Sequence, residues 1–441
     1  MLERSSWQPR LADGPGLLHE RLAAAFAEDI VEQVICAGAR LPAHRDLAYR
    51  LGVSVGTVTK AYALLERRGL VRSDRGRAMF AIGTSQCHNA FIDLSVNVPP
   101  RVISDRLLSA TMSEVARLID VNTFSAYPPL EGEYAHRATI AAWMSDVRLK
   151  VRPDEVILCN GARHALSVAF GAVCAPAVTI LTENLPYHGA VQLCQAADLH
   201  LEGLPMDAEG LDPEALKRRL ARGRKAREAS IVYVTPTAQN PTARCMSLAR
   251  RREIVELCRA FEVVVIEDDV YAAFGDKAVP TIREMAPERT IYVGGLSKTL
   301  TPGLRVGFLV CPGKFRPAAL RILTSLGSPV SALSCLILDR WIISGTASHL
   351  SSQICAEANR RMALASGILG LPPAGSGLHA FLELPPNTCV TVAKRAAELG
   401  VRVTPPSICL RTGSPTGIRL CLGAPPIDEL ERALHLVSGL L

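Results

Sequence analysis

Lys298 stands in the stretch YVGGLSKTLTPGLRVGFLV, residues 292–310, which contains no acidic side chain. The apolar run that ends at Val293 predicts a β-strand, so the two glycines after it should begin a loop at the strand's carboxyl end, where open α/β sheets bind ligands. A lysine there is either a surface residue with a solvated charge or a nucleophile. The nucleophile must be an uncharged amine, and a loop without carboxylates, near the cationic Arg305, should lower its pKa.

Other polar residues follow other predicted strands. Asp268 ends the apolar run in VVVIEDDVY, three residues before Tyr271, and Asn240 directly precedes a proline in TPTAQNPTA. The helix that begins in CNGARHAL would offer free backbone N–H groups to a phosphate at Gly161, Ala162 and Arg163. No single motif is specific, but because strand ends of a parallel sheet meet at one edge, these residues are expected to converge on one crevice.

The elements that position these residues alternate regularly. From about residue 91 onwards, helical patterns alternate with short β-branched runs, namely AVTILTE, SIVYVTP, EVVVIEDD and TIYVGG. Such alternation predicts an α/β fold with helices on both faces of a mainly parallel sheet.

A different pattern occupies the region before residue 82. A first helix should run from about Asp46 to Leu51 and be ended by Gly52, and Ser54 is a good N-cap for a second helix that Gly69 stops. Its inward stripe would be Val58, Ala61, Tyr62 and Leu65. Two helices joined by a tight glycine turn form a helix-turn-helix, and LVRSD and AMFAI predict a two-stranded wing.

The positive charge is concentrated in the same region. The whole chain has a net charge of +7, and residues 40–77 contain nine Lys or Arg against three acidic residues. This concentration favours a partner with a phosphate backbone. A second basic cluster, LKRRLARGRKAR at residues 216–227, has no accompanying motif and is interpreted as an exposed helix.

Length and composition limit the classes of protein. A chain of 441 residues is longer than one hydrophobic core usually organises, so more than one domain is expected. The polar stretch GTSQCHNA divides the chain into a domain at 1–82, a linker at 83–90 and a domain at 91–441. No transmembrane segment or signal peptide is predicted. Thirteen cysteines without a C-x-x-C pair argue against a disulfide framework or a metal site, so a cytoplasmic location is expected.

The first domain resembles the winged helix-turn-helix of GntR-type regulators. The resemblance is carried by LPAHRDLAYRLGVSVGTVTKAY, by the following L-x-x-x-GLV and by a glycine at the wing tip, although Arg77 replaces a second wing glycine. It implies binding to double-stranded DNA with the second helix in the major groove. The implied DNA contacts are Arg45, Ser54, Val55, Thr57, Lys60 and, from the wing, Arg75.

Residues 91–441 resemble fold type I pyridoxal-phosphate enzymes of the aspartate aminotransferase superfamily, through the ordered set around Gly161, Asn240, Asp268, Lys298 and Arg305. A GntR-type amino terminus joined to such a domain resembles the MocR family of regulators. The resemblance implies a large domain with a mainly parallel sheet, a smaller C-terminal α/β subdomain and bound pyridoxal 5'-phosphate.

The resemblance also assigns roles. Lys298 would form the internal aldimine, and Asp268 would pair with the pyridinium nitrogen. Asn240 and Tyr271 would hydrogen-bond the phenolic oxygen of the ring, on which Tyr187 would stack. The expected phosphate ligands are Gly161, Ala162, Arg163, Ser297 and Arg305.

Two more matches concern partners. Tyr127 in SAYPPLEG matches a tyrosine that reaches the neighbouring subunit's cofactor, which implies a homodimer, and Arg419 in GIRLCLG matches an arginine that binds the carboxylate of an amino compound. Three positions depart from the family: Gly295 replaces a serine, Ala162 a serine or threonine, and Ala243 a glycine. Two phosphate-binding hydroxyls are therefore missing, although no group needed for Schiff-base chemistry is absent.

Two functions remain open. The chain is either a dimeric transcriptional regulator that senses the cofactor, an amino acid or an amine through Lys298, or an aminotransferase with an appended DNA-binding module. The complete set of reactive residues keeps the enzyme possible, whereas the GntR-like module and its charge favour the regulator. A protein with a merely inherited site is disfavoured because Lys298, Asp268, Asn240 and Arg419 occur together.

Overall fold

The chain divides into two compact units, residues 1–90 and 91–441. The computed structural model describes residues 10–12, 16–31, 34–35, 38–74, 78–81, 91–121, 125–173, 178–327, 329–371, 377–404, 408–410 and 416–441. The predicted linker at 83–90 and the predicted DNA contact Arg75 lie outside these residues. Within them, no helix has the length and apolar character needed to cross a membrane.

The first unit is the predicted winged helix-turn-helix. It contains α1 (Leu18–Val31), α2 (His44–Leu51), α3 (Val55–Arg67) and an antiparallel pair of strands, β1 (Val71–Asp74) and β2 (Ala78–Ala81). Gly52 ends α2 in the left-handed conformation, with φ of 63°, which a glycine adopts without steric cost. The predicted inward stripe of α3 is buried. Sequence analysis did not identify α1, whose Leu22 and Phe26 complete this core.

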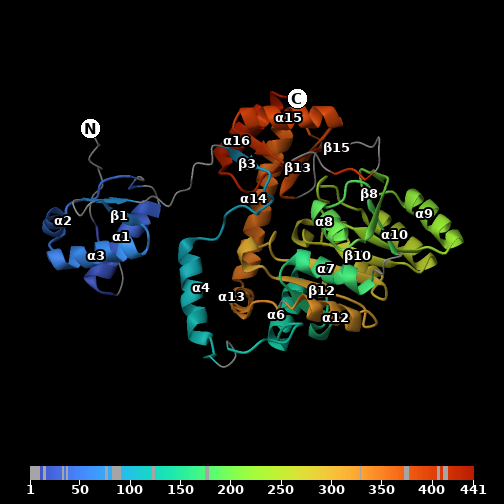
Figure 1. The fold of residues 1–441 in the computed structure, drawn as a ribbon, viewed down its shortest axis with the longest axis horizontal. Helices are drawn as coiled ribbons and strands as arrows, with labels where there is room; N and C mark the ends of the chain where they lie inside the picture. The colour runs from blue at the N-terminus through green and yellow to red at the C-terminus, as the bar shows by residue number, and fades with distance from the viewer. Residues whose placement is uncertain are drawn as a thin grey trace. The chain divides into compact units, whose positions relative to one another are not determined.

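The second unit is built on a seven-stranded sheet (Figure 1). In spatial order its strands are β4 (Val156–Cys159), β12 (Gly307–Val310), β11 (Thr290–Gly295), β10 (Val264–Asp268), β9 (Ala229–Val234), β5 (Val178–Glu183) and β6 (His200–Leu204). Strand β12 runs antiparallel to the other six strands, which are parallel to one another. The predicted mainly parallel sheet is therefore confirmed.

One detail of the predicted sheet was wrong. Strand β11 does not stop at Val293 but continues through Gly294 and Gly295, which pair with Phe308 and Gly307 of β12. The physical reason is close packing: a Cβ atom at Gly294 would lie 2.3 Å from the ring of Phe308. These glycines let two strands pair beside a large ring, so the turn that carries Lys298 begins after them.

Helices cover both faces of the sheet, as expected from the alternation of elements. In β9, Ile231 and Tyr233 enter a core on one face, whereas Val232 and Val234 enter a core on the other. The helices of this large domain are α4 (Asp105–Leu118), α6 (Tyr134–Val147), α7 (Ala162–Val173), α8 (His188–Ala196), α9 (Pro213–Ala226), α10 (Leu248–Ala260), α11 (Ile282–Met285), α12 (Arg316–Leu326) and α13 (Ala332–Ile343). Short 3-10 turns lie at η1 (Pro153–Glu155), η2 (Ala272–Phe274) and η3 (Pro302–Leu304), and β7 (Met206–Asp207) and β8 (Gly210–Leu211) form a small hairpin.

A smaller subdomain follows, as the family resemblance implied. The long helix α14 (Thr346–Leu369) leads to β13 (His379–Leu384), α15 (Pro386–Glu398), β14 (Val401–Val403), β15 (Thr416–Cys421) and α16 (Ile427–Ser438). Strand β3 (Ile92–Leu94), the first strand of the second unit, pairs with β14, so this subdomain joins the two ends of the unit. Figure 1 shows β3 among α15, α16 and β13.

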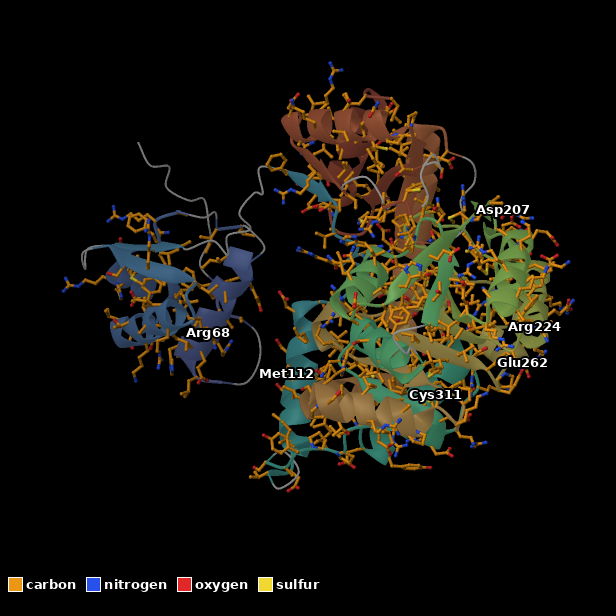
Figure 2. All side chains as sticks on the ribbon, turned by 45° about the vertical axis from the view of Figure 1, so that its right-hand side comes forward. Arg68, Met112, Asp207, Arg224, Glu262 and Cys311 are labelled. Carbon is orange, nitrogen blue, oxygen red and sulfur yellow. The ribbon has the colours of Figure 1, made fainter. Side chains whose placement is uncertain are left out.

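The basic cluster at residues 216–227 lies on α9, as interpreted from the sequence. Lys217, Arg218, Arg222 and Arg224 are exposed, and Figure 2 shows Arg224 at the outer edge of the second unit. Arg219 is the exception, because it is buried and forms ion pairs with Glu202 and Glu228 at 2.8 and 2.9 Å.

Candidate functional site

The carboxyl ends of the central strands open into a cavity of about 380 Å³. Ten residues predicted from the sequence line it: Ala162, Arg163, Tyr187, Asn240, Asp268, Tyr271, Ser297, Lys298, Arg305 and Arg419. The structure thus brings together side chains from positions 162 to 419. Their roles depend on the contacts that each one makes.

Lys298 lies on the turn after β11, where its side chain is largely enclosed. Its Nζ atom donates a hydrogen bond to the main-chain oxygen of Asn97. Burial lowers the pKa of Lys298 to about 8, and the cations Arg419 and Arg305 contribute to the decrease, while Cys421 opposes it. This amine is therefore uncharged in a larger fraction of molecules near neutral pH than an ordinary lysine is, and nucleophilic attack on a carbonyl group requires the uncharged form.

Asp268, at the end of β10, presents an unsatisfied oxygen atom. Its Oδ2 atom accepts a hydrogen bond from the hydroxyl group of Tyr233 at 2.9 Å, whereas its buried Oδ1 atom has no partner among the described residues. Burial raises the pKa of Asp268 to about 6, and the bond from Tyr233 opposes this shift. A buried acceptor without a partner is costly, so a ligand with an N–H group directed at Oδ1 would be stabilised here.

A second group of residues forms a cradle at the start of α7. A Cβ atom at Gly161 would lie 2.9 Å from Nη2 of Arg305, and one at Gly307 would lie 2.3 Å from the carbonyl carbon of Gly161. The absence of side chains thus lets the guanidinium group approach the helix start. A helix amino terminus beside a guanidinium group attracts an anion such as a phosphate.

The predicted set of backbone donors in this cradle needs one correction. The N–H group of Gly161 donates to the oxygen of Cys159 at 2.8 Å, because the chain turns tightly there before α7 begins. The first-turn amides of Ala162 and Arg163 lie in the helix, where no carbonyl group is available four residues earlier. A Cβ atom at Gly295 would lie 2.9 Å from that of Ala162, so the two positions that lack the family's hydroxyl groups face each other.

Tyr271 belongs to a buried hydrogen-bond chain that sequence analysis did not predict. Asn97 Nδ2 donates to the Tyr271 hydroxyl oxygen at 2.8 Å and approaches His379 Nδ1 at 3.2 Å. His379 Nε2 lies 3.2 Å from the oxygen of Gln239, and burial lowers the pKa of His379 to about 3. The ring is therefore neutral, with Nδ1 as acceptor and Nε2 as donor. Because Asn97 donates to Tyr271, the tyrosine proton is free to be donated to a ligand.

Arg419, on β15, also lines the cavity. Its Nη1 atom donates to Asn240 Oδ1 at 2.7 Å, and its Nη2 atom donates to the main-chain oxygen of Ser95 at 3.2 Å. Its Nε atom is buried and has no partner in the described part of the chain. A guanidinium group with an unused N–H group can bind a carboxylate.

The remaining predicted residues have different environments. Tyr187 is the N-cap residue of α8, and a Cβ atom at Gly189 would lie 2.4 Å from its ring, so the ring packs closely against the helix start. Burial raises the pKa of the Tyr187 hydroxyl group. Tyr127 does not line the cavity, and 96% of its surface is exposed.

Five residues that line the cavity were not predicted to do so from the sequence: Asn97, Leu166, Thr235, Val270 and Gly295. It also missed Tyr233 and His379, which lie behind Asp268 and Tyr271. Asn97 and His379 are polar residues within apolar stretches, SVNVPP and GLHAFLEL, and that contrast was the available signal. Neither belongs to a motif with its own spacing.

In the first unit, the described residues among the predicted DNA contacts are Arg45 on α2, the cap residue Ser54, and Val55, Thr57 and Lys60 on α3. Ser54 caps α3, since its hydroxyl oxygen accepts a hydrogen bond from the N–H group of Thr57 at 3.1 Å. Arg45, Val55 and Lys60 are exposed, and the buried stripe of α3 faces away from them. Tyr49 on α2 is 90% exposed and was not predicted.

Comparison with known families divides the chain in the same way. Residues 89–437 match the family described as aminotransferase class I and II, and residues 18–80 match the bacterial regulatory proteins of the gntR family.

Two relatives align with this chain over nearly its whole length. The HTH-type pyridoxine biosynthesis transcriptional regulator PdxR of Corynebacterium glutamicum is 27% identical over 97% of this chain and 98% of its own. YdeF of Bacillus subtilis, an HTH-type transcriptional regulator, is 25% identical over 99% of this chain and 97% of its own. Among solved structures, LysN, the α-aminoadipate aminotransferase of Thermus thermophilus complexed with N-(5'-phosphopyridoxyl)-L-leucine, is similar in fold. It has a TM-score of 0.71 at 22% identity, over 85% of this chain and 96% of its own.

Proposed function

We propose that this chain, which belongs to the aminotransferase class I and II family and is a transcriptional regulator of the MocR type, responds to pyridoxal 5'-phosphate and to an amino compound. The gntR-family unit would bind double-stranded DNA through α3, and the cavity of the second unit would bind the small molecules. Because bacterial regulators of this kind act on DNA, we expect the protein to work in the cytoplasm.

The observation that carries the proposal is the fit between the cavity and pyridoxal 5'-phosphate. The unpaired Oδ1 atom of Asp268 suits the ring N–H group, and the cradle of Arg305 and α7 suits the phosphate group. Lys298 provides an amine with a lowered pKa at the same cavity. When bound, this cofactor supplies an aldehyde that condenses with amines and a ring that withdraws electrons.

The chain's own groups would orient such a ligand. Asp268 would keep a proton on the ring nitrogen, since a buried carboxylate stabilises a neighbouring cation. Tyr271 would donate its free proton to a ring oxygen, and Tyr187 would pack on one face of the ring. All of these groups line the same cavity as Lys298.

Arg419 supports an effector that carries a carboxylate as well as an amine. Its unpaired Nε atom is available for one carboxylate oxygen, and Nη1 is already fixed by Asn240. An amino acid would then compete with Lys298 for the cofactor while Arg419 held its carboxylate. By differential affinity, such a ligand can shift DNA binding by about 1 to 3 kcal/mol.

We also propose that the protein acts as a homodimer. Helix α4 exposes Leu108 and Met112 on its outer face, where Figure 2 shows Met112, and Tyr127 is almost fully exposed nearby in sequence. An exposed apolar surface of this kind is typical of a subunit interface. A partner subunit would cover it and bring Tyr127 towards a neighbouring cofactor site.

Sustained transamination is the alternative function. It is supported by the presence of Lys298, Asp268, Tyr271 and Arg419 around one cavity. An aminotransferase must also release a keto acid and accept a second one in each cycle. A sensor needs only the first exchange of amines.

The deciding experiment measures DNA affinity and product formation with the same protein. Purified full-length chain is titrated onto its own upstream DNA with and without pyridoxal 5'-phosphate and a panel of amino acids, and keto acids are assayed in parallel. We expect a spectral change, altered DNA affinity and little keto acid. Keto acid production at about 1 per second or faster, with no ligand effect on DNA binding, would establish the enzyme instead.

Two variants test the assignments in the cavity. Lys298→Ala should remain folded but lose the visible absorbance of the bound cofactor. Arg419→Ala should keep that absorbance but lose the response to carboxylated ligands. Arg222→Ala, on the exposed surface of α9, is the matched control and should leave both properties unchanged.

A further inference from the structure

The segment Ser95–Asn97 directly follows β3 and contacts three residues of the cavity. It begins only five residues after the boundary between the two units, which lies after Ala90. The residues between are anchored, since the N–H group of Ile92 donates to the oxygen of Gly400 at 2.8 Å and β3 pairs with β14. The chain that leaves the DNA-binding unit thus enters the wall of the cavity after one short strand.

The main chain of this segment accepts hydrogen bonds from two of the basic side chains that line the cavity. Lys298 Nζ donates to the oxygen of Asn97, and Arg419 Nη2 donates to the oxygen of Ser95. The Sγ atom of Cys421 also approaches the Ser95 oxygen, at 3.4 Å. In the proposed function, Lys298 binds the cofactor and Arg419 binds the carboxylate of the effector.

The side chain of Asn97 attaches the segment to a third residue. Its Nδ2 atom donates to Tyr271 and approaches the neutral ring of His379, so both of its protons are used. Its Oδ1 atom is buried and has no partner in the described residues. The NH2 group of this amide therefore positions Tyr271, and its Oδ1 atom remains available to accept a hydrogen bond from a ligand amine.

Occupation of the cavity must disturb these bonds. A Lys298 amine that has reacted with a carbonyl group has fewer protons to donate to Asn97, and an Arg419 that binds a carboxylate gains a partner that competes with Ser95. Leu94, next to the segment, packs in the same core as Ile418 and Leu420, which flank Arg419. A shift of the segment would thus be transmitted to β3 and to the chain before it.

We propose that Asn97 is a positioning residue, and that the segment Ser95–Asn97 couples occupation of the Lys298–Arg419 cavity to the chain that leads to the DNA-binding unit. This inference rests on the proposed function and adds the route of the signal. The two states are a segment bonded to Lys298, Arg419 and Tyr271, and a segment whose bonds to Lys298 and Arg419 are replaced by ligand contacts.

The first test compares Asn97→Ala with Val96→Ala in the full-length protein. Val96 is the neighbouring residue and is 50% exposed, so it is the matched control. Pyridoxal 5'-phosphate alone is the probe, and the readouts are its visible absorbance over a range of pH and the ratio of DNA affinities with and without it. An allosteric ratio is typically about 5- to 150-fold.

We expect Asn97→Ala to bind the probe, to show a changed pH dependence of the absorbance because Tyr271 has lost its donor, and to have an affinity ratio reduced to less than about twofold. Val96→Ala should retain the wild-type ratio and spectrum. An undiminished ratio in Asn97→Ala, or an equal loss in Val96→Ala, would overturn the inference. If pyridoxal 5'-phosphate does not change the DNA affinity of the wild-type protein, the proposed function is wrong, and this inference, which rests on it, is wrong as well.

A second test needs no variant and so remains decisive if Asn97→Ala does not fold. Hydrogen exchange of the wild-type protein is measured with and without pyridoxal 5'-phosphate, peptide by peptide. We expect exchange to change in β3, at the amides of residues 92–94, as well as at the cavity. A change confined to the cavity, with β3 unaltered, would overturn the inference.

Discussion

The low pKa of Lys298 predicts an unusual pH dependence for the attachment of pyridoxal 5'-phosphate. Only the neutral amine reacts, and burial together with Arg419 and Arg305 lowers the pKa to about 8. The neutral fraction is then roughly one in ten at pH 7 and nine in ten at pH 9, so the rate should rise about tenfold and level off. A lysine with its ordinary pKa would be neutral in only about one molecule in 3,000 at pH 7.

The assay follows the visible absorbance after cofactor-free protein is mixed with pyridoxal 5'-phosphate at pH 6 to 10. Lys298→Ala gives the background from surface lysines, which should still be rising at pH 10. Arg419→Met should move the plateau of the wild-type profile to higher pH, because the arginine charge favours the neutral amine. A wild-type rate that rises roughly 100-fold from pH 7 to pH 9 without levelling off would refute the argument that the cavity activates this lysine.

Three further predictions concern the DNA contacts, a helix cap and the phosphate cradle. Arg45→Ala and Lys60→Ala should each flatten the slope of log affinity against log salt concentration by about one, without changing the cofactor absorbance, and two unchanged slopes would exclude this surface. Ser54→Ala removes the cap of α3 and should lower the free energy of unfolding of the first unit by about 1 kcal/mol in urea titrations. Gly307→Ala forces a Cβ atom against the backbone of the cradle and should destabilise the second unit by about 1 to 3 kcal/mol. The control Gly313→Ala, whose Cβ atom would meet nothing within 4 Å, should leave the stability unchanged, and equal effects of the two variants would contradict the packing argument.

The sequence was most informative where a local pattern determines a local structure. Gly52, Ser54 and the stripe of α3 act within a few residues of themselves, so the helix-turn-helix could be located from turns, caps and periodicity. Lys298 and Asp268 could be placed at one cavity because the carboxyl ends of parallel strands share one edge of a sheet. The family resemblance then added Arg419, whose strand has no distinctive pattern.

The sequence was least informative where residues far apart must meet. Asn97 contacts Tyr271, 174 positions later, and His379, 282 positions later, and nothing in the three short stretches specifies that meeting. The glycines of β11 were misread because their role depends on the ring of Phe308 in a strand that runs the opposite way. Such contacts follow from tertiary packing, which overrides the local preference of glycine for turns.

The pairing of β3 with β14 has a consequence for the order of synthesis. Val401 lies about 310 residues after Ile92, and at about 5 to 20 residues per second a ribosome needs on the order of 15 to 60 s to supply it. The core of the first unit, from Leu22 to Ala81, is complete at the beginning of that interval. Each growing chain therefore passes through a stage in which all residues of the helix-turn-helix core have been synthesised while the cavity beside Lys298 still lacks Arg419. Under the proposed function, the DNA-binding unit would thus be synthesised well before the ligand site is complete.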